Sequence, residues 1–188
     1  MEQLTARSAP YPWPFHGRFD PRRTAILVVR DGDIAPPDQP TIELLGRLVQ
    51  RGRGLGVTIG SLPHGAPHGA SSDPVSDITA ARPHYGGFSG TDLDSELRKR
   101  RITDLIFAGF PFELGADCTM RQANDLGYEC LALDDCCTGL AADTLAGAMS
   151  SIRMSGGIFG AVATTSAVLD LFERAHDAAP APTGGSPK

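Results

Sequence analysis

Side chains able to carry out chemistry gather in three short segments of this chain. VRD supplies Arg30 and Asp31 at the end of an apolar run, RPHYGGF supplies Arg82 and His84, and FPFELGADC supplies Glu113 and Cys118. Carboxylates and imidazoles transfer protons, thiols attack carbonyl carbons, and guanidinium groups bind anions. If both arginines face one pocket, these residue types predict a cationic site that favours a small carboxylate or a similar anion.

The elements around these segments alternate between strand and helix. Apolar runs predict strands at 24–29, 55–60, 104–109, 128–133 and 157–163, and helical spacing predicts helices at 41–49, 91–100, 115–126, 143–154 and 166–175. This alternation predicts a single-domain, three-layer α/β/α fold with a parallel sheet and helices on both faces. Ligands of such sheets bind beyond the carboxyl ends of the strands, which directs attention to Arg30, Asp31, the segment after Gly60 and the turn after Gly109.

Composition divides the chain into three parts. We expect an N-terminal extension over 1–20, one folded domain over 21–176, and a disordered tail over 177–188 because AAPAPTGGSPK is poor in apolar residues. The Gly- and Pro-rich stretch 61–90 is predicted to be a surface loop over the strand ends.

Charge and hydropathy exclude some classes of function. A net charge of -5 argues against nucleic-acid binding, which needs a basic face. There is no apolar run long enough for a membrane span and no signal-peptide core, so we expect a cytoplasmic protein. The four cysteines have neither zinc-ligand nor CxxC spacing. Reduced thiols are therefore expected at the vicinal Cys136 and Cys137, with a redox pair as the alternative.

Four segments together resemble the isochorismatase-like cysteine hydrolases, and among them the amidohydrolases of ureides such as biuret and ureidoacrylate. The segments are YPWPFHGRFDPRRTAILVV, RPHYGGFSGTDL, AGFPFELGADCTMRQANDLGYE and DDCCTGL. The resemblance covers about residues 10 to 170. It implies a parallel sheet of roughly six strands, assembly into oligomers, no cofactor, and hydrolysis of non-peptide C–N bonds in small amides.

In this family an aspartate, a lysine and a cysteine work together. The cysteine attacks the carboxamide carbon, the carboxylate moves the proton, and the lysine holds both groups ionised. The matching positions here are Arg30 or Asp31, Arg82 and Gly115. Arginine is not equivalent to lysine, and glycine cannot attack, so the thiol mechanism is predicted to be lost.

The turn before the cysteine position of the family contains a cis peptide bond. Its counterpart here is Phe110–Pro111, and because proline tolerates cis geometry, we expect this bond to be cis, with a trans bond as the alternative. Phe110, Pro111, Glu113, Arg30 and His84 are the expected substrate-binding residues.

Two interpretations of function follow. The first is a degenerate family member, a pseudoenzyme that binds a small anionic amide or ureide, or that serves as a subunit of a homo-oligomer or of a hetero-oligomer with an active paralogue. The alternative comes from the isochorismatases, which have glycine at the cysteine position and use the aspartate as a general acid. Asp31, Arg82 and Gly115 would then be the working set.

Three further candidates concern histidine and cysteine. His64 and His68 lie where the nicotinamidase relatives hold a metal, but Leu62 replaces the required aspartate, so exposed histidines without metal are expected. His84 is a candidate base. Cys118 is a candidate substitute nucleophile, with a small buried helix residue as the preferred interpretation.

Overall fold

A computed structural model describes residues 19–32, 34–65 and 76–177 of the chain. Its centre is a sheet of six parallel strands in the order β3-β2-β1-β4-β5-β6. The strands are β1 (Thr24–Arg30), β2 (Thr58–Pro63), β3 (Ile78–Thr79), β4 (Asp104–Phe110), β5 (Glu129–Leu133) and β6 (Ala161–Ala163). The predicted fold class is confirmed.

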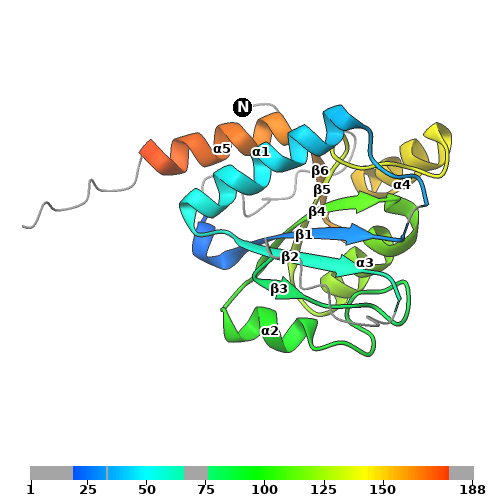
Figure 1. The fold of residues 1–188 in the computed structure, drawn as a ribbon, viewed down its shortest axis with the longest axis horizontal. Coiled ribbons are helices and arrows are strands. Elements are labelled where there is room, and N and C mark those ends of the chain that lie inside the picture. The colour runs from blue at the N-terminus through cyan, green and yellow to red at the C-terminus, as the bar shows by residue number, and fades with distance from the viewer. Residues whose placement is uncertain (1–18, 33, 66–75, 178–188) are drawn as a thin grey trace, which may run out of the picture.

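Five helices cover the two faces of the sheet, as Figure 1 shows. They are α1 (Gln39–Leu55), α2 (Leu93–Lys99), α3 (Asp117–Asp125), α4 (Ala142–Met154) and α5 (Thr165–Asp177). Apolar side chains of α1 and α5 pack on one face, and those of α2, α3 and α4 pack on the other. A strand between two such layers is buried on both sides, which explains the continuous apolar run of β1.

Two short elements complete the domain. A 3₁₀ turn, η1 (Pro21–Arg23), leads into β1, and a π-helical turn, η2 (Phe112–Ala116), leads from β4 into α3. Among the described residues, none of the helices has the length and apolar character needed to cross a bilayer.

The structure corrects three boundaries. Helix α1 continues to Leu55 and is closed by Gly56 at φ 88°, so β2 begins three residues later than predicted. The segment 61–90 is not only a surface loop, because it contains the end of β2, strand β3 and the buried Arg82. Strand β6 is shorter than predicted, because glycines with positive φ at 156, 157 and 160 form a turn before it. Residues 1–18 of the predicted extension and 178–188 of the predicted tail lie outside the described residues.

Arg101, which follows the end of α2, has a φ of 59°. This left-handed conformation crowds the Cβ of an L-residue and favours glycine after a helix. We expect Arg101→Gly to raise the free energy of unfolding by about 0.5–1 kcal/mol, measured by urea denaturation. Arg101→Ala is the matched control, since it removes the side chain but keeps the Cβ. Equal stability of the two variants would contradict the explanation from backbone strain.

Candidate functional site

The candidate site lies where the strand order changes direction. Strands β1 and β4 are neighbours in the sheet, and the chain proceeds from β1 toward β3 on one side and from β4 toward β6 on the other. This arrangement leaves a switch point at the carboxyl ends of β1 and β4, the usual ligand position in open parallel sheets. Asp31 follows β1 there, and its backbone N–H donates to the carbonyl of Phe110 at 3.0 Å.

Strand alternation decides between Arg30 and Asp31. In β1, Ala25, Leu27 and Val29 belong to the core under α2, α3 and α4, whereas Ile26 and Val28 belong to the core under α1 and α5. Asp31 continues the first series toward η2 and is buried, with 3% of its surface exposed. Arg30 continues the second series and is exposed. Asp31 is therefore the residue whose side chain lies beside η2, whereas Arg30 contributes its backbone carbonyl to this site and not its side chain.

Arg82 is fully buried and uses every donor that it has. Its guanidinium carries five N–H groups. Nε donates to the carbonyl of Leu62 at 3.0 Å. Nη2 donates to the carbonyl of Arg30 at 2.9 Å and to the carboxylate of Asp31 at 2.7 Å. Nη1 donates to the carbonyls of His84 and Tyr85. No donor of Arg82 is left for a ligand.

The carboxylate of Asp31 accepts hydrogen bonds at both of its oxygens. Oδ1 accepts from Nη2 of Arg82, and Oδ2 accepts from the backbone N–H of Gly115 at 2.9 Å. Nδ1 of His64 lies 3.2 Å from Oδ1. The side chain of Asp31 is 0% exposed, as is that of Arg82. A carboxyl group surrounded by donors in this way acts as an acceptor, which is the role of its ionised form.

Gly115 has no room for a side chain. A Cβ on its backbone would lie 2.5 Å from Nη1 of Arg82, 2.7 Å from Nη2, and 2.7 Å from Oδ2 of Asp31. These separations are well inside van der Waals contact, so any side chain at this position would displace the buried ion pair. The guanidinium thus fills the space that a nucleophile at position 115 would need.

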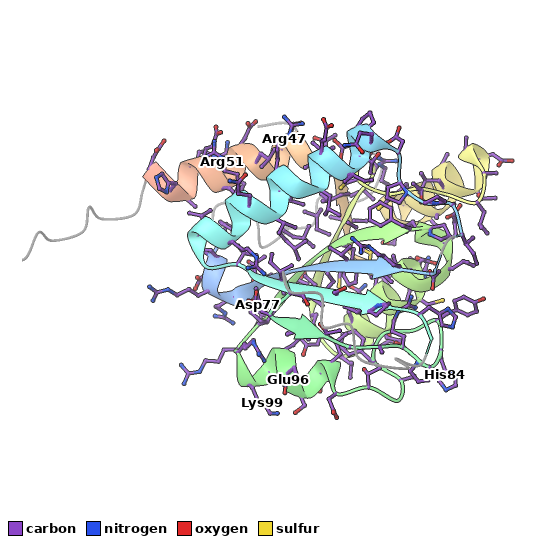
Figure 2. The ribbon with its side chains drawn as sticks, in the orientation of Figure 1. Arg47, Arg51, Asp77, His84, Glu96 and Lys99 are labelled. Carbon is purple, nitrogen blue, oxygen red and sulfur yellow. The ribbon has the colours of Figure 1, made fainter. Side chains whose placement is uncertain are left out.

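The remaining predicted residues have different surroundings. The Phe110–Pro111 bond is cis, as predicted. Glu113 points to the start of α4, where its Oε1 accepts from the N–H of Leu140 at 3.1 Å and from the hydroxyl of Thr144 at 2.5 Å. His84 is exposed on the loop beyond the carboxyl ends of the strands (Figure 2), and its backbone carbonyl, not its ring, contacts Arg82.

His64 is a site residue that the sequence did not single out for this position. It directly follows β2, the neighbour of β1. A polar residue at the end of a strand is the sequence feature that could have identified His64 as a site residue. The signal was obscured because β2 was predicted to end at Gly60. His68, which the sequence paired with His64 as an exposed histidine without metal, lies outside the described residues. Within the described ranges, no group of three or more His, Cys, Asp or Glu residues is placed to hold a metal ion.

Cys118 is exposed, contrary to the expectation of a buried helix residue, whereas Cys130, Cys136 and Cys137 are buried. Partial burial, followed by the charges of Asp117 and Asp31, raises the pKa of the Cys118 thiol. A raised pKa leaves less thiolate at neutral pH, and the thiolate is the reactive form.

We therefore expect iodoacetamide to alkylate Cys118 at pH 7 more slowly than it alkylates glutathione, as measured by intact mass. Asp117→Asn removes the nearer of the two negative charges and should accelerate the reaction. Alkylation of wild type faster than that of glutathione would instead identify an activated thiol.

Comparisons with known proteins agree with this fold. A family model described as Isochorismatase domain matches residues 41–167, a range that includes Arg82 and Gly115 but not Asp31. An isochorismatase family protein of Escherichia coli O157:H7, YecD, is 34% identical over 80 residues, which are 43% of this chain and 41% of YecD. The ureidoacrylate amidohydrolase RutB of Acinetobacter baylyi is 43% identical over 61 residues, which are 32% of this chain and 25% of RutB. The chain thus spans less than half the length of these curated relatives.

Solved structures give the same picture at lower identity. A cysteine hydrolase from Pseudomonas syringae pv. phaseolicola has a TM-score of 0.74 at 22% identity, covering 90% of this chain and all of that chain. The nicotinamidase SaPncA from Staphylococcus aureus has a TM-score of 0.63 at 19% identity, covering 75% of this chain and 98% of that chain. At these identities the likeness establishes the fold.

Proposed function

Because this chain belongs to the isochorismatase family, we propose that it is a member without thiol chemistry, one that takes a small amide or ureide at the carboxyl edge of its sheet and forms no covalent intermediate with it. The observation that carries the proposal is the occupied space beside Gly115. There the guanidinium of Arg82 and the carboxylate of Asp31 lie within 2.5–2.7 Å of the position that a Cβ would take.

The ligand class is proposed from the relatives. RutB is named as a ureidoacrylate amidohydrolase, and SaPncA is named as a nicotinamidase. Both names describe proteins that act on small amides. A ligand at this edge would meet His64 and Tyr85, which are exposed, and not the saturated guanidinium of Arg82. Assembly with further copies of the chain or with an active paralogue belongs to the same proposal.

The geometry gives less support to Asp31 as a general acid. A general acid must carry a proton on one of its oxygens and deliver it to the leaving group. Both oxygens of Asp31 instead accept hydrogen bonds from Arg82 and Gly115, and the side chain is shielded from solvent. The carboxylate is therefore better placed to hold neighbouring donors than to protonate a ligand.

The test combines binding with a search for a covalent adduct. Wild type, Asp31→Asn and Cys118→Ser are titrated with biuret, ureidoacrylate, nicotinamide and isochorismate by calorimetry, and each mixture is also examined by intact-mass spectrometry. We expect wild type to bind at least one of the amides and to show no acyl adduct with any of them. An adduct that disappears in Cys118→Ser would overturn the thiol-free proposal. Failure to bind any compound would overturn the ligand-binding part and leave the partner-subunit interpretation.

A further inference from the structure

We infer that His64 and Asp31 form a proton-transfer pair, in which the imidazole of His64 is the group that meets water and ligand. The backbone of His64 is fixed on two sides. Its N–H donates to the carbonyl of Arg30 at 2.8 Å, and the next residue, Gly65, donates to the carbonyl of Arg82 at 2.9 Å. His64 and Arg82 thereby form an isolated parallel bridge that extends the sheet beyond β2. The imidazole is thus carried by ordered backbone.

The ring of His64 is positioned by groups on two of its sides. Nδ1 lies 3.2 Å from Oδ1 of Asp31, and the ring contacts Tyr85 edge-on, with a centroid separation of 4.8 Å and an interplanar angle of 71°. Asp31 is itself fixed by Arg82 and by the Gly115 amide. With a carboxylate 3.2 Å from Nδ1, we expect the proton to lie on that nitrogen and the lone pair on Nε2.

Exposure differs sharply within this cluster. The side chains of Asp31 and Arg82 are 0% exposed, whereas that of His64 is 31% exposed. Of these three groups, His64 alone reaches solvent. Among the residues that the structure describes, the charged groups nearest its ring are the carboxylate of Asp31 and, behind it, the guanidinium of Arg82, and Tyr85 contacts the ring from the loop. A solvent-facing imidazole backed by a buried carboxylate is the arrangement of a general base.

The reaction that this pair supports needs only water and the amide. Nε2 takes a proton from a water molecule while the water oxygen bonds to the carbonyl carbon of the amide or ureide. The C–N bond of the resulting tetrahedral species then breaks, and the imidazolium returns the proton to the leaving nitrogen. One water is consumed, and an acid and an amine or ammonia are released. This inference rests on the proposed thiol-free site and adds to it the group that moves the proton.

The test measures release of ammonia or amine from biuret and ureidoacrylate between pH 5 and 9. We expect wild-type turnover to rise with pH, because a general base acts in its unprotonated form, and His64→Gln to lose about 100-fold in rate together with this pH dependence. His176→Gln is the matched control. It replaces an exposed histidine near the end of α5, at the opposite end of the molecule from the strand arrowheads in Figure 1, and should leave the rate unchanged. Absence of turnover by wild type, or an unchanged profile in His64→Gln, would overturn the inference.

A second measurement does not depend on turnover. Nitrogen-15 NMR of the histidine rings should show His64 in the Nδ1–H tautomer in wild type, and Asp31→Asn should shift it away from that form. A dominant Nε2–H tautomer in wild type would contradict the pair. The two proposals fail separately: an acyl adduct overturns the thiol-free site, whereas binding without turnover leaves that site standing and removes the role of His64.

Discussion

Gly115→Cys places a thiol at the position that the resemblance matches to the nucleophile of the family, yet we expect the variant to be less stable by about 2–3 kcal/mol and to remain without thiol activity. The added Cβ would lie 2.5 Å from Nη1 of Arg82 and 2.7 Å from Oδ2 of Asp31. Both groups are buried within a hydrogen-bonded cluster and cannot move aside without losing partners, so the cost is that of overpacking. Urea denaturation gives the free energy of unfolding, and intact mass with the ureide panel gives the chemistry.

Gly147→Cys is the matched control for this prediction. Gly147 lies in α4, is exposed, and has no atom within 4 Å of the position that a Cβ would take. The same change of residue there should not lower the stability. If Gly115→Cys were as stable as the control and formed an acyl adduct, the space beside Gly115 would have to be open in solution.

Positions 82 and 115 should be energetically coupled. Lysine at 82 lacks the two terminal nitrogens that Arg82 places beside Gly115. We therefore expect the double variant Arg82→Lys/Gly115→Cys to be more stable than the sum of the single effects by about 1 kcal/mol or more, measured as a double-mutant cycle. Additive effects would show that the clash is relieved elsewhere.

Arg82→Met should lower the free energy of unfolding by about 3–5 kcal/mol, because it leaves the carboxylate of Asp31 buried without its ion-pair partner. The carbonyls of Leu62, His84 and Tyr85 also lose a donor. Methionine keeps much of the volume, so the loss reports on the charge and the hydrogen bonds. Urea denaturation at pH 7 measures it.

Two variants make the interpretation of Arg82→Met specific. Arg98→Met removes an exposed arginine that pairs with Asp94, donates to the carbonyl of Leu126 at 3.1 Å and lies over the ring of Tyr128. Because these contacts lie at the surface, we expect a loss of no more than about 1 kcal/mol. Asp31→Asn combined with Arg82→Met removes both charges and should be less damaging than Arg82→Met alone. A loss in Arg82→Met no larger than that in Arg98→Met would contradict a stabilising role for the buried pair.

Much of the fold could be predicted because local patterns and tertiary structure agree. The apolar run of β1 predicts a strand buried on both faces, and it is one. The start of β2 could not be predicted as well. LGVTIG is a run of strand formers, but the left-handed Gly56 closes α1 inside it and moves the strand along the chain. The two-residue β3 has no pattern of its own, because its place depends on pairing with β2.

The site could be predicted in its positions but not in its contacts. Side chains alternate along β1, so Asp31 lies on the same side as Val29, which is the side of η2. The sequence could therefore have decided between Arg30 and Asp31. No sequence pattern indicates that all five N–H donors of Arg82 form hydrogen bonds within its own chain. Four of the acceptors are backbone carbonyls, whose directions depend on the folded backbone and not on residue type.

The crowding beside Gly115 also constrains the route by which such a site can arise or revert. If the site descends from one with cysteine at 115 and lysine at 82, a change to an arginine with the partners of Arg82 would place its guanidinium within 2.5–2.7 Å of the cysteine Cβ. A path on which the thiol is lost first avoids this destabilised intermediate. Once the arginine is in place, restoring the cysteine alone lowers the stability of the protein, so a single mutation does not restore the earlier site.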